Sequence, residues 1–244
     1  MKEDSLFYFS SPNKFTAFLE ELDVYNNWQI RHGLLNARGK EIEDRRYTKF
    51  LRKAFYDSGF FRMQVSIAEI VSWLDTTSLM ERVFEVLQQK LEVEVFESIE
   101  MSLEYMIKMS KRMRIDYLLQ YKDKVLLIEF RTVDQFNKIR PTWDYKFKEL
   151  LQYKELMSYY VLDKTLRIYA FIPLYEYNGK VLNQKHRDYN NNQVEFFAEY
   201  IEKYLRENKN KDPIQPVSGT KVPRFAGPST FARLPELRDV ESCD

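Results

Sequence analysis

Apolar side chains in the first 75 residues recur every three to four positions, the spacing of one helix face. Ser10 or Ser11 followed by Pro12 is typical of a helix start, because serine caps free backbone N–H groups and proline suits the first turn. Further helices are expected over 41–56 and 64–75. We interpret the basic side chains of 41–56 as a solvated face; phosphate binding is the alternative.

The middle of the chain alternates between helical and strand patterns. The stretch Asp75-Thr76-Thr77-Ser78 is expected to cap the next helix. Two apolar runs around Lys122-Asp123-Lys124 predict a β-hairpin, and the pattern of 102–111 leaves helix and loop open. The predicted order is helix 79–91, strand 92–99, hairpin 114–121 and 125–133, helix 143–160, strand 166–174 and helix 192–207. This order favours an α/β or α+β sandwich.

Composition changes near residue 210. Every tyrosine lies before it, whereas most prolines lie beyond it, at Pro213, Pro216, Pro223, Pro228 and Pro235. Proline fixes φ and removes a hydrogen-bond donor, so this part is expected to be an extended arm. The predicted organisation is a helical N-terminal region over 1–75, an α/β core over 76–208 and a Pro-rich arm over 209–244.

Composition and charge exclude several classes of protein. The chain has 244 residues, 44% of them hydrophobic, and a net charge of +1, so a core is possible and no global basic field draws it to nucleic acid. A single cysteine excludes an internal disulfide, and two histidines exclude a three-histidine metal site. No apolar run is long enough for a membrane span and no signal peptide is evident, so we expect a cytoplasmic protein with no membrane partner.

Two acidic residues stand inside the predicted hairpin, where strands disfavour carboxylates. Asp116 lies in the first strand, and Glu129 and Arg131 lie two residues apart in the second, so the latter two share a face. In a hairpin Asp116 can lie close to Glu129. Two carboxylates and one cation suit a divalent metal with a phosphate. A structural salt-bridge cluster on an open sheet face is the alternative interpretation.

Asp116 followed, after twelve residues, by Glu129-Phe130-Arg131 resembles the PD-(D/E)XK nuclease superfamily over about residues 79–175. The resemblance implies a restriction-endonuclease-like mixed sheet flanked by helices, with Mg²⁺ or Mn²⁺ as cofactor. It makes Asp116, Glu129 and Arg131 catalytic, with Asp116 and Glu129 as the metal ligands. Two positions differ from the motif: Ile115 stands in place of proline, and Arg131 in place of a lysine that, unlike arginine, can deprotonate. The supporting residues it implies are Glu81 or Glu85 on the preceding helix and Gln152 on the following one.

The function implied is an endonuclease that hydrolyses DNA phosphodiester bonds, in restriction or phage defence. The partner that this function implies is nucleic acid, with DNA preferred over RNA. Such an endonuclease could also form a homodimer. A basic run before Asp116 supplies candidate backbone contacts, with a solvated surface as the alternative; these residues are Lys108, Lys111, Arg112 and Arg114. The alternative function is a catalytically inactive nuclease-fold module that binds a protein or nucleic-acid partner.

A second resemblance concerns the arm. The stretch VPRFAGPSTFARLP, 222–235, is similar to the N-terminal segment of agmatinase-type ureohydrolases. The metal-binding motifs of that family have no counterpart in this chain, so the resemblance implies no ureohydrolase activity.

Overall fold

The computed structural model describes residues 2–24, 28, 30, 34–58, 65–107, 113–133, 135–173 and 183–207, with the backbone alone for residues 136 and 183–192. All of them belong to one compact unit, Met1–Glu207. The predicted arm 209–244 lies outside the described residues. None of the helices in this part of the chain is long and apolar enough to cross a bilayer.

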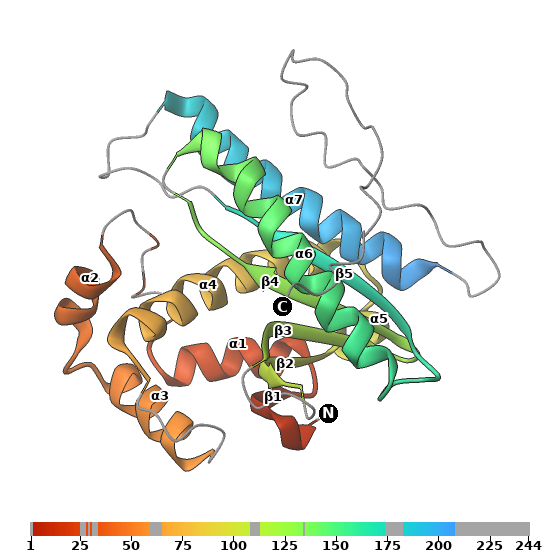
Figure 1. Cartoon of the computed structure of the whole chain (residues 1–244), viewed down its shortest axis with the longest axis horizontal. Coiled ribbons are helices and arrows are strands. Elements are labelled where there is room, and N and C mark those ends of the chain that lie inside the picture. The colour runs from red at the N-terminus through yellow and green to blue at the C-terminus, as the bar shows by residue number, and fades with distance from the viewer. Residues whose placement is uncertain are drawn as a thin grey trace, which may run out of the picture. The chain divides into compact units, whose positions relative to one another are not determined.

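The N-terminal region opens with a 3₁₀ turn and a strand and continues with helices (Figure 1). Helix α1 begins where the sequence predicts, because the Ser11 side chain accepts a hydrogen bond from the Lys14 N–H at 3.3 Å and Pro12 occupies the first turn. Strand β1 was not expected in this region. The elements are the 3₁₀ turn η1 (Lys2–Asp4), β1 (Ser5–Phe9), α1 (Pro12–Glu21), α2 (Leu35–Ile42), α3 (Arg46–Asp57) and α4 (Ile67–Lys90).

Five strands of the described chain form one mixed sheet in the order β1-β2-β3-β4-β5. The first three pairings are antiparallel, and β5 runs parallel to β4. The predicted hairpin is confirmed as β3 and β4. The elements are α5 (Val93–Glu97), β2 (Glu100–Met106), β3 (Arg114–Tyr121), β4 (Lys124–Phe130), the 3₁₀ turn η2 (Phe136–Lys138), α6 (Ile139–Ser158), β5 (Thr165–Phe171) and α7 (Asn183–Arg206).

Helices cover the sheet from both sides (Figure 1). On one face, side chains of β2 to β5 pack in a large core with α1, α3, α4 and α7. On the other face, Leu118 and Leu127 pack against Leu150 and Met157 of α6. Helix α6 lies over β4 and β5. The predicted mixed α/β architecture is therefore confirmed.

The predicted cap at residues 75–78 is wrong, because α4 continues through it. Arg38 donates two hydrogen bonds to the Asp75 carboxylate, at 2.7 and 2.8 Å, and the Trp28 indole N–H donates a third at 2.9 Å. The Thr76 hydroxyl donates to the Trp73 carbonyl within the helix. Because these polar groups are hydrogen-bonded, the helix continues through them. The predicted boundary between the N-terminal region and the α/β core, after residue 75, therefore falls inside α4.

The predicted strand over 92–99 is also wrong. These residues contain the short helix α5, and the strand begins at Glu100. Val93, which alternates with Val95 in the sequence, is 66% exposed, whereas Phe96 is buried and packs edge-on against Phe84. The alternation of Val93 and Val95 therefore does not indicate a buried face of a strand.

Candidate functional site

The two hairpin acids meet at the end of β3 and β4, as the sequence predicts. Asp116 and Glu129 face each other one step beyond the last paired residues, Tyr117 and Ile128. The Asp116 backbone N–H donates to Glu129 Oε1 at 3.2 Å, and the Phe130 N–H donates to Asp116 Oδ2 at 2.8 Å. Each carboxylate thus accepts a backbone hydrogen bond from the opposite strand, which holds both acids in place after the ladder ends.

The cation at this acid pair comes from α6. The ammonium of Lys146 lies 2.6 Å from Glu129 Oε2 and 2.8 Å from Glu149 Oε2. The Tyr153 hydroxyl donates to the other oxygen of Glu149 at 2.8 Å. Positions 146, 149 and 153 share one helix face. This spacing is visible in the sequence, but nothing local indicates that the face would lie on Glu129.

The structure does not place the predicted Arg131 and Gln152 side chains among these groups. Arg131 follows the last residue of β4 and is exposed; its backbone N–H donates to the Phe171 carbonyl. Its side chain has no ion pair or hydrogen bond with the described part of the chain. Gln152 is exposed on α6, whereas Glu149 and Tyr153 on the same helix contact the site. In the described structure the cation that contacts Glu129 is Lys146.

A third acid, Glu104 of β2, lies close enough to Asp116 for their charges to interact. Its φ is 53°, the left-handed region that a non-glycine residue seldom adopts in a strand. The Trp73 indole N–H donates to Glu104 at 2.7 Å, and Arg114 lies 2.9 Å from the same carboxylate. Strained backbone of this kind often accompanies functional sites. The sequence shows no sign of the unusual φ, so Glu104 was missed.

Arg114, a predicted nucleic-acid contact, is paired with acids of this group. Its guanidinium bridges Glu104 and Glu69, the latter at 2.6 Å, and its side chain is 29% exposed. Glu69 is therefore the acid of α4 that pairs with Arg114, rather than the predicted Glu81 or Glu85. The other predicted nucleic-acid contacts, Lys108, Lys111 and Arg112, lie outside the described residues.

The two predicted helix acids do not contact the group. Glu81 is buried, and the negative charges of Glu85 and of Glu20 on α1 raise its pKa further than burial does alone. Glu85 is exposed. Neither has an ion pair or hydrogen bond to Asp116 or Glu129 among the described contacts, so the structure separates them from the hairpin acids.

Burial makes the carboxylates of this group costly to ionise. Burial raises the pKa of Glu129 well above its ordinary value, and the Asp116 charge raises it further, against the opposing effect of Lys146. Burial likewise raises the pKa of Asp116. Burial raises the pKa of Glu104 to about 8, with Asp116 adding to the rise and Arg114 opposing it. A cation that neutralised these carboxylates would relieve the cost of ionising them.

The pKa of Lys146 is raised as well, but for a lysine this favours the charged form, whereas for the carboxylates it favours the neutral form. Burial alone would lower its pKa, but the neighbouring Glu129 and Asp116 carboxylates raise it above the ordinary lysine value. The side chain therefore remains an ammonium at neutral pH. It can stabilise negative charge, but it is a poor base.

The donor set of the acid pair suits a hard divalent cation, because it consists of carboxylate oxygens. Asp116 Oδ1 accepts no hydrogen bond from the described residues, so one oxygen remains available. No three His, Cys, Asp or Glu side chains in the described ranges are arranged to hold a metal alone. A metal here would share its coordination between Asp116, Glu129 and oxygens from substrate or water, as is common for Mg²⁺.

Comparisons of the sequence with known protein families and with curated proteins gave no match.

Proposed function

We propose that the protein is a Mg²⁺-dependent nuclease that hydrolyses DNA phosphodiester bonds, with Asp116, Glu129 and Lys146 as its central residues. The observation that carries the proposal is the meeting of three groups at one point. Two carboxylates are each held by a backbone N–H of the opposite strand, and an ammonium lies 2.6 Å from one of them. Two acids with one cation are suited to phosphoryl chemistry.

The order of elements supports a restriction-endonuclease-like fold. Helix α4 precedes the antiparallel strands β2, β3 and β4, and α6 leads to β5, which runs parallel to β4. The PD-(D/E)XK resemblance implies this order, with the acids on the hairpin. The same resemblance suggests a role in restriction or phage defence.

The chain's own residues have separable tasks in this proposal. Asp116 and Glu129 would hold Mg²⁺, or Mn²⁺, which when bound lowers the pKa of water and neutralises charge on the phosphate. Lys146 would donate hydrogen bonds to a phosphate oxygen and stabilise the charge that develops on it. Glu149 keeps that ammonium in place, and Tyr153 orients Glu149.

The test compares the wild-type chain with Asp116→Asn and Glu129→Gln on single-stranded and duplex DNA, with Mg²⁺ or Mn²⁺. We expect cleavage by the wild type and loss of cleavage by both variants. The variants should stay folded, because neutral amides remove the cost of burying charge. The matched control is Glu155→Gln, which removes an exposed acid of α6 and should cleave normally.

The alternative is a catalytically inactive nuclease-fold module, favoured by Arg131 at the position of the motif lysine. If the wild type binds DNA but cleaves neither DNA nor RNA with either metal, the nuclease proposal fails and the binding module remains. If the two acid variants unfold at neutral pH, the acids are structural.

A further inference from the structure

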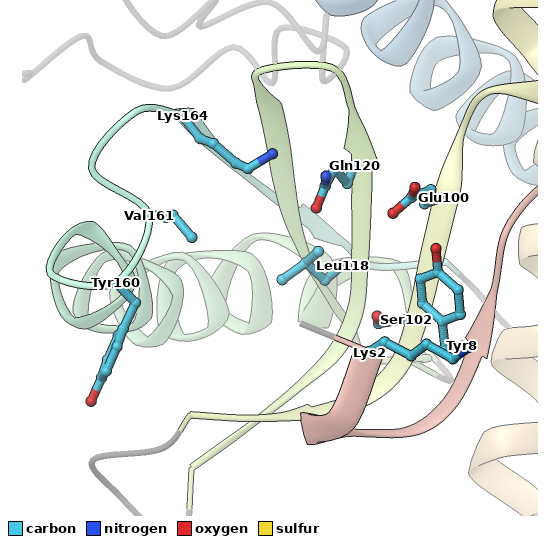
Figure 2. Close-up of a pocket in the computed structure, with 9 residues that line it drawn as sticks. All are labelled: Lys2, Tyr8, Glu100, Ser102, Leu118, Gln120, Tyr160, Val161 and Lys164. Atoms are coloured by element: carbon cyan, nitrogen blue, oxygen red, sulfur yellow. The ribbon is translucent and has the colours of Figure 1, made fainter.

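A pocket of about 380 Å³ lies between strands β1 to β3 and the segment that follows α6, and Leu118 and Val161 form part of its lining. Figure 2 shows Tyr8 and Lys2 on one side of the pocket, and Tyr160 and Lys164 on the other. Ser102 of β2 and Gln120 of β3 line it between these sides. A cavity of this size holds a small ring system.

The pocket and the acid pair share strand β3. Asp116, Leu118 and Gln120 alternate along it, and Leu118 packs in the core on the α6 side, where Lys146 meets the acids. At about 3.3 Å per residue, Gln120 lies about 13 Å along the strand from Asp116. A nucleic-acid strand whose phosphate lay at Asp116 would have to span this distance, a few nucleotides, to reach the pocket.

The lining chemistry suits a nucleobase between two phosphates. The amide of Gln120 and the hydroxyl of Ser102 can donate and accept hydrogen bonds, and Glu100 can accept from an exocyclic amine. Tyr160 offers an aromatic ring that is 40% exposed. The two lysines place positive charge on opposite sides, and Lys164, which donates to the Lys122 carbonyl at 3.0 Å, has further hydrogens to donate.

We infer that this pocket is a subsite for an unpaired nucleobase of the DNA strand held at the acid pair. The inference rests on the proposed function, because it takes its ligand from there. A base paired in a duplex presents only its edges and cannot enter, so the subsite favours single-stranded or locally opened DNA. Stacking on Tyr160 and hydrogen bonding to Gln120 hold the base, and Lys2 and Lys164 hold the flanking phosphates.

The test measures binding of the full chain to a fluorescein-labelled single-stranded 12-mer, without divalent cations so that binding is separated from cleavage. The variants are Tyr160→Ala, Gln120→Ala and Lys164→Gln. The matched controls are Tyr159→Ala, which removes a neighbouring tyrosine that is 66% exposed and outside the pocket, and Lys154→Gln, which removes an exposed charge on α6. An abasic 12-mer reports binding through the backbone alone.

We expect Tyr160→Ala and Gln120→Ala each to weaken single-strand binding about fivefold or more, as loss of a stacked base does. Neither should change binding of the abasic strand, whereas Lys164→Gln should weaken both. The two controls should bind as the wild type does. If the pocket variants and their controls bind equally, or if the wild type binds no single strand, the inference is wrong.

A cleavage assay with Mg²⁺ on the same strand separates the two proposals. Normal cleavage with an unchanged KM in the pocket variants overturns the subsite and leaves the nuclease. Base-dependent binding without cleavage by the wild type supports the subsite and overturns the nuclease.

Discussion

Glu81 is a buried acid whose pKa is raised by burial and by other acids, and this gives a sharp prediction. It lies on α4 with 6% of its surface exposed, and its Oε1 has no hydrogen-bond partner in the described structure. Burial raises its pKa from 4.5 to about 7, and the negative charges of Glu85 and Glu20 add to the rise. Glu81→Gln removes the charge and keeps the shape.

The size and sign follow from the pKa shift. Because the folded state holds the Glu81 proton more tightly, this group stabilises the fold below about pH 4.5, and that contribution is lost as pH rises to about 7. At about 1.4 kcal/mol for each pH unit, the loss amounts to up to about 3 kcal/mol. The free energy of unfolding of Glu81→Gln should therefore be close to that of the wild type at pH 5. At pH 8 it should exceed the wild-type value by up to about 3 kcal/mol.

Urea unfolding followed by circular dichroism at pH 5 and pH 8 measures both values, with Glu155→Gln, which removes an exposed acid of α6, as control. A difference between Glu81→Gln and wild type that is the same at both pH values would refute the reasoning. Cleavage by Glu81→Gln should match the wild type, since Glu81 lies apart from the acid pair. Loss of cleavage would show instead that Glu81 is part of the site.

Three further predictions concern other parts of the chain. The Lys124 ammonium donates hydrogen bonds to the carbonyls of Tyr204, Leu205 and Glu207 at the end of α7. Lys124→Met should therefore lower the free energy of unfolding by about 3 kcal/mol and the Tm by roughly 6–12 °C, whereas Lys122→Met should change the Tm little. Removing residues 212–244 should leave the circular dichroism spectrum and Tm unchanged, because the compact unit ends at Glu207; a large fall in Tm would contradict this. Tyr153→Phe should lower kcat about fivefold at constant KM, since one hydrogen bond to Glu149 is lost; an unchanged kcat would exclude a positioning role.

The hairpin and its acid pair could be predicted because the signals are local. Strand alternation and a short polar turn define β3 and β4, and an antiparallel hairpin then brings Asp116 beside Glu129. The start of α1 follows from Ser11 and Pro12 for the same reason. In each case the residues that decide the structure are close in sequence.

The missed features depend on residues far apart in sequence. Helix α4 continues because Arg38, 37 residues before Asp75, neutralises its carboxylate. Lys146 becomes a site residue because α6 packs over β4, and no local pattern distinguishes it from Lys148. Glu104 reaches Trp73 through an unusual backbone conformation that the sequence does not reveal.

The most direct test of the account is a comparison of Lys146→Met with Arg131→Met in Mg²⁺-dependent DNA cleavage. Both changes remove one positive charge, but only Lys146 lies against Glu129, at 2.6 Å. The account predicts that Lys146→Met lowers kcat about 100-fold or more, as loss of one preorganised charge-stabilising donor does, and that Arg131→Met stays near the wild-type rate. The reverse result, with cleavage lost in Arg131→Met and kept in Lys146→Met, would contradict it.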